Sequence, residues 1–566
     1  MVLPREVLRP SVGGAQVLVV FSEEDEGSRL ISANVKTTLA MSRVAADFVE
    51  VTALTPAMLQ VPGPLVVVAT EQWTRLPDPA SVLDFVRRGG RVVFLMRAYF
   101  NSFNEMTGIL EQRGFVTEDR AGVRVLGPLF PGKDGLTYSA MTHSMLEVRL
   151  SSEAKVLAET LTGQPLVWTH RFGAGEVLYV NSTMMKSKIM RGLMLQCIAY
   201  LPDYFLSTIF NGLVFNIDDF PAPIRFGRVE SIYQEYFMET PRFFRDIWWP
   251  DTYSFARRHN LALTGLAIST FNEATTSPLP PINPLEWAQL VYFGRRLSEV
   301  GGELGIHGYN HQSLTLVGQM DFASFGYTPW PSQEAMAEGL RILRDGIIEK
   351  FGDVRIFSYV PPSNIVSREG RLAVAQVFPD VRVFAGVYAG DGELGLLEQE
   401  FGRDPYVPHV VSFPRLSSGY LHNDDVLWAI YNGIAHFGLV HHFIHPDDLL
   451  DPIRSGGHTW EQMDRQINAM FREIRRRFPS LRAMTLVQAH RYFIQSEGLE
   501  VSSYQLGDVI KVQHNRVGVP FYHLLRLRSG TVEAVVGGEF YLVCRINRIY
   551  VIRAQHELVE IKLQRR

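Results

Sequence analysis

The segment LVFNIDDFPAP, residues 213–223, decides the fold and points to the site. An apolar strand ends in Asp218 and Asp219, and prolines follow at once at 221 and 223. Two adjacent carboxylates repel each other and are costly to desolvate, so the fold gains nothing from them without a cation or water. The ordinary alternative is a solvated turn with an aspartate as helix N-cap.

A second segment, ELGIHGYNHQSL (303–314), leads from a strand into two histidines. His307 and His311 are four residues apart, so one helical or turn face carries both imidazoles and can hold a single ion. Glycine at 308 leaves backbone room beside the first of them. The alternative is two unrelated core or surface histidines.

The third segment, HHFIHPDDLLD (441–451), holds three histidines where a strand passes into a loop. The alternation of a strand places His441 and His445 on one face and His442 on the other. Any one of them alone could be a hydrogen-bonded core histidine.

The three segments follow one another over about 230 residues that alternate between strands and helices. Barrel enzymes carry their catalytic groups at the C-terminal ends of strands, so the segments are predicted to meet at one site. One aspartate and two histidines hold a divalent metal and leave positions open for water and substrate. Such an open set is typical of a catalytic site, whereas a closed structural site has four protein ligands.

This set of motifs resembles the polysaccharide deacetylases of the NodB-homology type, over about 290 of the 566 residues. The resemblance implies that Asp218 is the general base and His445 the general acid. It implies that Asp219, His307 and His311 bind one divalent metal, Zn²⁺ in the first place and Co²⁺ or Ni²⁺ as alternatives. The implied reaction is metal-dependent removal of N-acetyl groups from an N-acetylhexosamine polysaccharide, with release of acetate.

One motif departs from that family. The family's Arg-x-Pro-Tyr-Gly segment is matched here by YVPPSN (359–364). In this match Ser363 supplies the backbone N–H that helps to hold the oxyanion, and Asn364 replaces the glycine because it tolerates a positive φ. A valine then stands where the family has the arginine that orients the base. Arg225 and Arg355 are the two candidates to replace that arginine, and the sequence does not choose between them.

Residues 1–203 are predicted to form a non-catalytic accessory domain. Its strands are short apolar runs: AQVLVVF (15–21), PLVVVAT (64–70) and GRVVFLM (90–96). With the helix SVLDFVRRGG (81–90) between the last two, they indicate an open parallel sheet. The runs FVRRGGRVVFL and RFGAGEVLYV resemble the glutamine-amidotransferase-like or flavodoxin-like group, and the second run is predicted to be a hairpin turning at Gly173 and Gly175. The sequence has no nucleophile elbow with a cysteine. It also has no phosphate loop after the first strand, since residues 22–27 read SEEDEG.

The predicted fold class is a multidomain α/β protein. A flavodoxin-like or amidotransferase-like open sheet is followed by a distorted (β/α) barrel over 204–498 and by a small antiparallel β-domain over 499–566. Helices of the barrel are predicted to begin at Asn283-Pro284, Ser332 and Thr459. This order of domains, with NIDDFP, HGYNH and PPSN, is similar to the deacetylases of partially N-acetylated galactosamine exopolysaccharides, namely the Pel-type bacterial and galactosaminogalactan-type fungal enzymes.

Substrate contacts are predicted from aromatic and polar residues near the motifs. They are Tyr309, Trp330, Tyr359, Asn364, Asp391 and His422, with Trp248 and Trp249 as further stacking candidates. Aromatic rings stack on sugar faces, and the alternative for each is ordinary core packing. The C-terminal β-domain could bind glycan or be a plain structural cap. Its candidate residues are Phe521, Tyr522, Phe540 and Tyr541.

Composition narrows the partners. The chain has 55 lysines and arginines against 59 aspartates and glutamates, a net charge of −4, which argues against binding nucleic acid through a basic field. No apolar run reaches the roughly 18 residues that a transmembrane helix needs. Two distant cysteines, Cys197 and Cys544, exclude a disulfide framework and make a cysteine-bound metal unfavourable.

The expected partners are a polysaccharide substrate and proteins of an exopolysaccharide system. The sequence shows no signal-peptide core. An extracellular, periplasmic or cell-envelope location is therefore inferred from the substrate class alone. Two other functions stay open. One is a catalytically silent glycan-binding or scaffold protein on the same fold, which the missing arginine favours. The other is a related amidohydrolase that acts on peptidoglycan.

Overall fold

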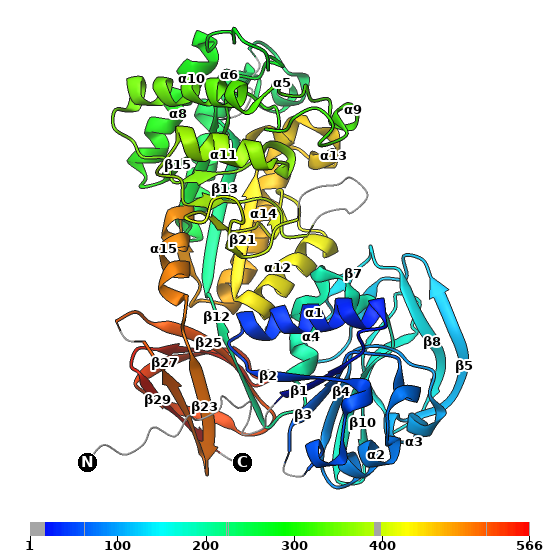
Figure 1. Cartoon of the computed structure of the whole chain (residues 1–566). Helices are drawn as coiled ribbons and strands as arrows, with labels where there is room; N and C mark the ends of the chain where they lie inside the picture. The colour runs from blue at the N-terminus through cyan, green and yellow to red at the C-terminus, as the bar shows by residue number, and fades with distance from the viewer. Residues whose placement is uncertain are drawn as a thin grey trace.

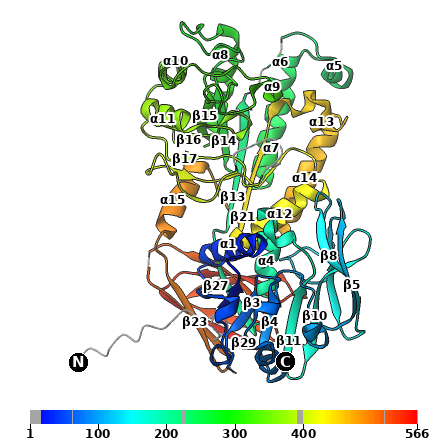
Figure 2. The ribbon, with the colours of Figure 1, turned by 45° about the vertical axis from the view of Figure 1, so that its right-hand side comes forward.

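The computed structural model describes residues 17–60, 63–221, 224, 226–389, 398–516 and 518–564. Figure 1 shows the N-terminal region (blue to cyan) and the C-terminal sheets (orange to red) side by side beneath the central region (green to yellow). The view in Figure 2 has the central region above the other two as well. The chain is therefore a mixed α/β protein with several sheets, as the sequence predicts.

The apolar runs of the N-terminal region form the parallel half of a nine-stranded sheet. The parallel strands are β2 (Ala46–Glu50), β1 (Val17–Phe21), β3 (Leu65–Val68), β4 (Arg91–Phe94) and β11 (Gly175–Val180). The remaining strands are β10 (Pro165–Phe172), β9 (Lys155–Glu159), β6 (Val123–Val125) and β7 (Thr137–Tyr138). The buried strands β1, β3 and β4 alternate in the chain with helices α1 (Glu26–Met41) and α2 (Pro79–Arg87). The predicted hairpin is present as β10 and β11.

The turn of that hairpin requires a glycine at Gly173. Its φ is +62°, and a Cβ there would come within 2.5 Å of the carbonyl oxygen of Arg87. A left-handed backbone that touches another backbone leaves no room for a side chain. The region also carries a two-stranded ribbon, β5 (Ile109–Glu118) with β8 (His143–Leu150), at the right-hand edge of Figure 1.

The central sheet is parallel and curls around the site. Its main strands are β13 (Gly212–Phe220), β14 (Leu263–Ile268), β15 (Glu303–Gly308), β16 (Ser358–Tyr359), β17 (Val383–Phe384) and β21 (Leu439–Ile444). β13 to β17 follow one another across the sheet, and β21 lies on the other side of β13. Residues 411–418 pair with β17 through β19 (Val411–Ser412) and with β21 through β20 (Ser417–Ser418). The sheet therefore has the curled form expected of a distorted barrel.

Helices cover this sheet, and three of them begin where the sequence predicts. They include α7 (Trp249–Arg258), α8 (Pro284–Glu299), α10 (Gln333–Phe351), α11 (Arg368–Val377), α12 (Asp424–Phe437), α14 (Trp460–Arg477) and α15 (Leu486–Ser496). The Asn283 side chain caps α8 and the Ser332 side chain caps α10. Thr459 forms a capping box with Gln462 at the start of α14. Among the helices of the described ranges, none has the length and apolar character needed to cross a bilayer.

The C-terminal region consists of two four-stranded antiparallel sheets. Its strands are β23 (Val501–Leu506), β24 (Val509–His514), β25 (Phe521–Leu527), β26 (Thr531–Val536), β27 (Gly538–Cys544), β28 (Ile549–Ala554) and β29 (Leu558–Gln564). An eighth strand, β12 (Tyr204–Ile209), pairs with β25 along its whole length. Residues that the sequence assigns to the start of the barrel thus complete the C-terminal sheet. The sequence prediction misses this pairing because the partner strand lies more than 300 positions away in the chain.

Candidate active site

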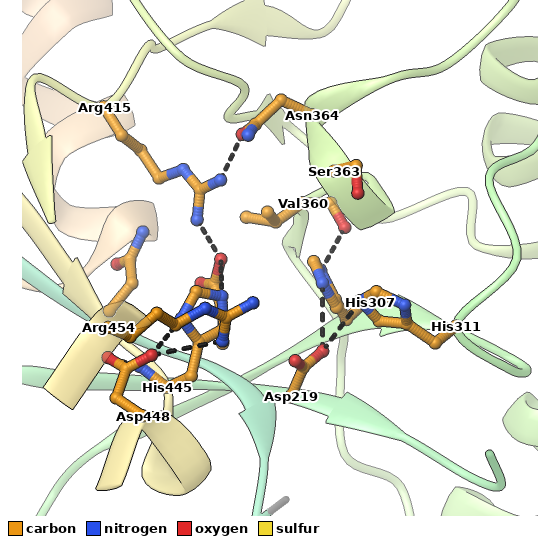
Figure 3. Close-up of polar contacts among 12 residues, drawn as sticks. Asp219, His307, His311, Val360, Ser363, Asn364, Arg415, His445, Asp448 and Arg454 are labelled. Atoms are coloured by element: carbon orange, nitrogen blue, oxygen red, sulfur yellow. Dashed lines mark hydrogen bonds and ion pairs between the residues drawn. The ribbon is translucent and has the colours of Figure 1, made fainter. Parts of the chain in front are cut away.

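The three predicted metal ligands meet at the C-terminal ends of β13 and β15. Asp219 Oδ1 lies 3.3 Å from His307 Nε2 and 3.3 Å from His311 Nε2 (Figure 3). The three side chains offer ligand atoms within 4.8 Å of one another. Asp219 has a φ of +50°, so the backbone turns sharply there. The carboxylates of Asp218 and Asp219 therefore have different contacts. The predicted grouping of Asp219, His307 and His311 is confirmed.

These residues fit a divalent metal. His307 Nδ1–H donates to the carbonyl oxygen of Val360 at 2.7 Å, which leaves Nε2 free to bind an ion on the Asp219 side. Burial lowers the pKa of His311, which favours the neutral imidazole that a metal ligand needs. Asp219 Oδ1 is buried and makes no hydrogen bond of good geometry with any described residue. One carboxylate oxygen and two imidazole nitrogens suit Zn²⁺ with a position left open.

The charge of Asp219 is favoured at this place. Burial acts to raise its pKa, but the neighbouring imidazoles of His311 and His307 outweigh burial and hold the pKa well below its usual range. The carboxylate is therefore ionised and ready for a cation.

The first aspartate has a different partner. Asp218 is only 1% exposed, and Arg415 donates a hydrogen bond to its Oδ2. The same guanidinium donates to Asn364 Oδ1 and lies 3.7 Å from the centre of the Phe443 ring. Arg415 thus holds Asp218 in place from the segment between β19 and β20.

Of the two arginines proposed from the sequence, Arg355 does not have this role. Arg355 is exposed, and Arg225 lies outside the described residues. Arg415 escapes sequence reasoning because it follows a strand of two residues, which gives no periodic signal. Its distance of nearly 200 positions from Asp218 hides the pairing further.

In the YVPPSN segment the positive φ that the sequence allows at Asn364 is present, and Ser363 has one as well. Ser363 and Asn364 have φ values of +48° and +63°, and both residues line the cleft beside Asp218. The hydroxyl of Ser363 lies 2.6 Å from the hydroxyl of Tyr327, which in turn lies 3.4 Å from His311 Nδ1. The role of the Ser363 N–H toward an oxyanion stays a prediction.

His445 follows β21 and faces Asp218 across the cleft. Its Nε2 lies 4.0 Å from Asp218 Oδ2, and its Nδ1 lies 3.2 Å from Asp448 Oδ1. Arg454 pairs with the same Asp448 oxygen at 3.1 Å (Figure 3). Burial acts to lower the pKa of His445, but the hydrogen bond and charge of Asp448, with Asp219 and Asp218, raise it to about 9. The imidazole is therefore protonated at neutral pH, as a general acid must be.

The other two histidines of this segment belong to the core. His441 Nδ1 lies 3.0 Å from the carbonyl oxygen of Pro414, and its Nε2 lies 2.9 Å from Asn216 Nδ2. His442 lies between Ser417 and the carbonyl oxygen of Gly419. Neither lines the cleft, and burial lowers their pKa values to about 3 and about 4.

A cleft of about 420 Å³ connects the metal-ligand candidates His307 and His311 with Asp218 and His445. It is lined by Asp218, His307, His311, Ser363, Asn364, Arg415, Phe443, His445, Asp448 and Arg454, together with residues 418–426 in part and Ile453. Asp448, Arg454 and Arg415 are the functional residues that sequence reasoning misses. Of these three residues, only Asp448 could have been found from the sequence, because it is the third residue after His445.

Most of the predicted aromatic contacts are wrong. Tyr309, Trp330 and Tyr359 are fully buried, so no ring face is open to a sugar. The same holds for Trp248, Trp249, Phe521 and Tyr522, whereas Phe540 and Tyr541 are partly exposed. His422 stands between the lining residues Leu421 and Asn423 without lining the cleft itself. Asp391 lies outside the described residues.

Fold and site define a multidomain α/β protein with an Asp-His-His cluster that could hold a metal ion and a separate Asp-Arg pair, at the mouth of a curled, mainly parallel sheet. The chain belongs to the family described as "Uncharacterised protein conserved in bacteria (DUF2194)", whose model matches residues 135–551. The family model that matches is not one described by NodB homology. No curated protein matches the sequence.

Solved structures support the fold. The crystal structure of Agd3, described as a novel carbohydrate deacetylase, has a TM-score of 0.54 at 11% identity. That match covers 98% of this chain and 99% of the Agd3 chain, so the two share the whole arrangement of regions. A β-galactosidase from Bacillus circulans sp. alkalophilus matches 36% of each chain at 16% identity, with a TM-score of 0.26, which is too low to support any argument.

Proposed function

We propose that this protein is a metal-dependent deacetylase that releases acetate from an N-acetylhexosamine polysaccharide. The observation that carries the proposal is that two adjacent carboxylates have different partners. Asp219 faces two imidazoles, and Asp218 faces a guanidinium and a protonated imidazole across the same cleft. Groups of different pKa placed on opposite sides of a cleft are what acid–base hydrolysis of an amide needs.

The residues divide the work as follows. Asp218, held by Arg415, accepts a proton from the attacking water. His445, held by Asp448, donates a proton to the departing amine nitrogen. Asp219, His307 and His311 would hold a divalent ion, which would supply Lewis-acid chemistry toward the acetamide carbonyl.

The silent-protein alternative loses its main support. It depended on the absent motif arginine, and Arg415 supplies a guanidinium to Asp218 from the segment between β19 and β20. An N-acetylgalactosamine exopolysaccharide as substrate, and a location outside the cytoplasm where such polymers lie, are part of the proposal. Similarity in fold to a carbohydrate deacetylase supports a carbohydrate as the substrate.

Acetate release tests the function directly. We expect the Zn²⁺-loaded protein to release acetate from oligomers of N-acetylgalactosamine faster than from those of N-acetylglucosamine. Release from peptidoglycan fragments alone would favour the related amidohydrolase. No release from any of them, with one metal bound per chain, would support the silent binding protein.

Removing Arg415 tests the replacement of the motif arginine. Arg415→Met leaves Asp218 buried without its partner, so we expect a loss of about 3–5 kcal/mol in the free energy of unfolding. We expect kcat to fall about a hundredfold because the base is misplaced, while metal content is unchanged. Denaturant unfolding and acetate assays measure both. Arg355→Met, at an exposed arginine, is the matched control, and equal losses in the two variants would contradict the role of Arg415.

The pH profile tests His445 as the acid. A general acid works only when protonated, so activity falls as the pH rises through its pKa, near 9 here. Asp448→Asn removes the charge that raises this pKa while burial still lowers it. We therefore expect the alkaline limb of kcat to move down by about one to two pH units.

The control for that shift is Asp451→Asn. Asp451 pairs with the same Arg454, at 3.6 Å, but has no contact with His445. It should leave the alkaline limb in place. An unmoved limb in Asp448→Asn would mean that another group donates the proton.

A further inference from the structure

A second cleft lies between the N-terminal sheet and the C-terminal sheets. It has a volume of about 340 Å³ and shares no lining residue with the catalytic cleft. β9, β10 and β11 line one side, and the end of β25 with the turn between β27 and β28 lines the other. Two regions of the chain thus build its walls.

The lining of this cleft carries an excess of positive charge. Its cations are Lys155, Arg171, Arg526, Arg528 and Arg548, and its carboxylates are Glu153 and Glu176. Arg528 pairs with Glu176. Across the described ranges, no carboxylate lies within ion-pair distance of the other four cations. Such an excess is local, because the chain as a whole has a net charge of −4.

Arg526 is the deepest of these cations. It is 7% exposed, and its guanidinium donates to the carbonyl oxygens of Pro128, at 3.1 Å, and Leu129, and to Gln196 Oε1 at 3.0 Å. Its Nε has no hydrogen-bond partner among the described residues. Burial lowers the pKa of Arg526 to about 10, which shows the cost of placing its charge there. A buried charge without a counter-charge is what a bound anion would stabilise.

The rim beside Arg526 is built with little freedom. Arg548 has a left-handed backbone, with φ at +50°, and its guanidinium donates to the carbonyl oxygen of Arg528 at 3.2 Å. Asn547 donates to the carbonyl oxygen of Phe130 at 3.1 Å. Arg526, Arg528 and Arg548 are therefore held in place before any ligand arrives, which lowers the entropic cost of binding.

From this geometry we infer that the second cleft binds a ligand bearing an oxyanion, either a carboxylate or a phosphate group. Arginine donors match both groups in shape and charge. The deacetylated polymer of the proposed reaction is cationic, so this cleft would repel it. The ligand is thus distinct from that product, and the inference stands without the proposed function.

Calorimetric titration of the full chain tests the site at low salt. The probes are inorganic phosphate and trigalacturonate, which carries carboxylates. We expect one site per chain for at least one probe, with affinity that falls as salt is added. Binding of phosphate alone would indicate a phosphorylated ligand, and binding of trigalacturonate alone an acidic sugar.

The variant for this test is Lys155→Ala with Arg548→Ala, since both side chains are exposed and their loss spares the fold. Affinity should fall about tenfold or more. Lys36→Ala, at an exposed lysine on α1, is the control and should bind as the unaltered chain does. Failure of both probes to bind, or unchanged binding by the double variant, would overturn the inference.

Discussion

Replacing Asp218 by asparagine should lower acetate release about a thousandfold while one metal ion stays bound per chain. The amide cannot accept a proton from the attacking water, but its oxygen can still accept the hydrogen bond of Arg415. The metal-binding atoms belong to Asp219, His307 and His311, which the change leaves in place. Initial rates of acetate release and metal analysis of the purified variant measure the two effects.

Asp219→Asn is the matched control for that experiment, since it removes the neighbouring carboxylate. It should lose the metal together with the activity. If Asp218→Asn lost its metal as well, the two aspartates would share one role, and the assignment of separate base and ligand would be wrong. A thermal unfolding curve for each variant separates these outcomes from loss of the fold.

The sequence reveals the part of the site that lies within short segments. Asp218 and Asp219 end one strand, His307 ends another, and His445 follows a third, so strand periodicity and residue chemistry suffice to place them together. Parallel strands of one sheet bring their C-terminal ends to the same edge. Alternation within a strand fails at the last motif, because the chain leaves β21 at Ile444 and His441 stays in the core.

The partners of these residues are hidden because they depend on long-range contacts. Arg415 reaches Asp218 from the segment between two strands of two residues each, and β12 pairs with a strand near the C-terminal end of the chain. Aromatic type also misleads. Tyr309, Trp330 and Tyr359 are as hydrophobic as residues that bind sugar, and only the packed structure shows that they are buried.

Removal of a metal ligand is the second large effect. His311→Ala should weaken metal binding more than a hundredfold, because a first ligand matters at least as much as the outer groups that orient it. With two ligands left, Asp219 and His307, dialysis against buffer should strip the ion. Acetate release should then fall to background, since no Lewis acid polarises the carbonyl.

Metal content after dialysis and the melting temperature with and without Zn²⁺ measure this loss. In the unaltered chain, Zn²⁺ should raise the melting temperature, because an ion that binds only the folded state stabilises it. In His311→Ala the rise should vanish. His422→Ala is the control, a histidine beside the cleft that does not line it, and it should keep both the ion and the rise. One ion per chain in His311→Ala would show that the centre lies elsewhere. The charges of Asp218 and Arg415 balance each other, so this pair needs no metal ion to be stable. Its role in the cleft would then have to be explained without a metal.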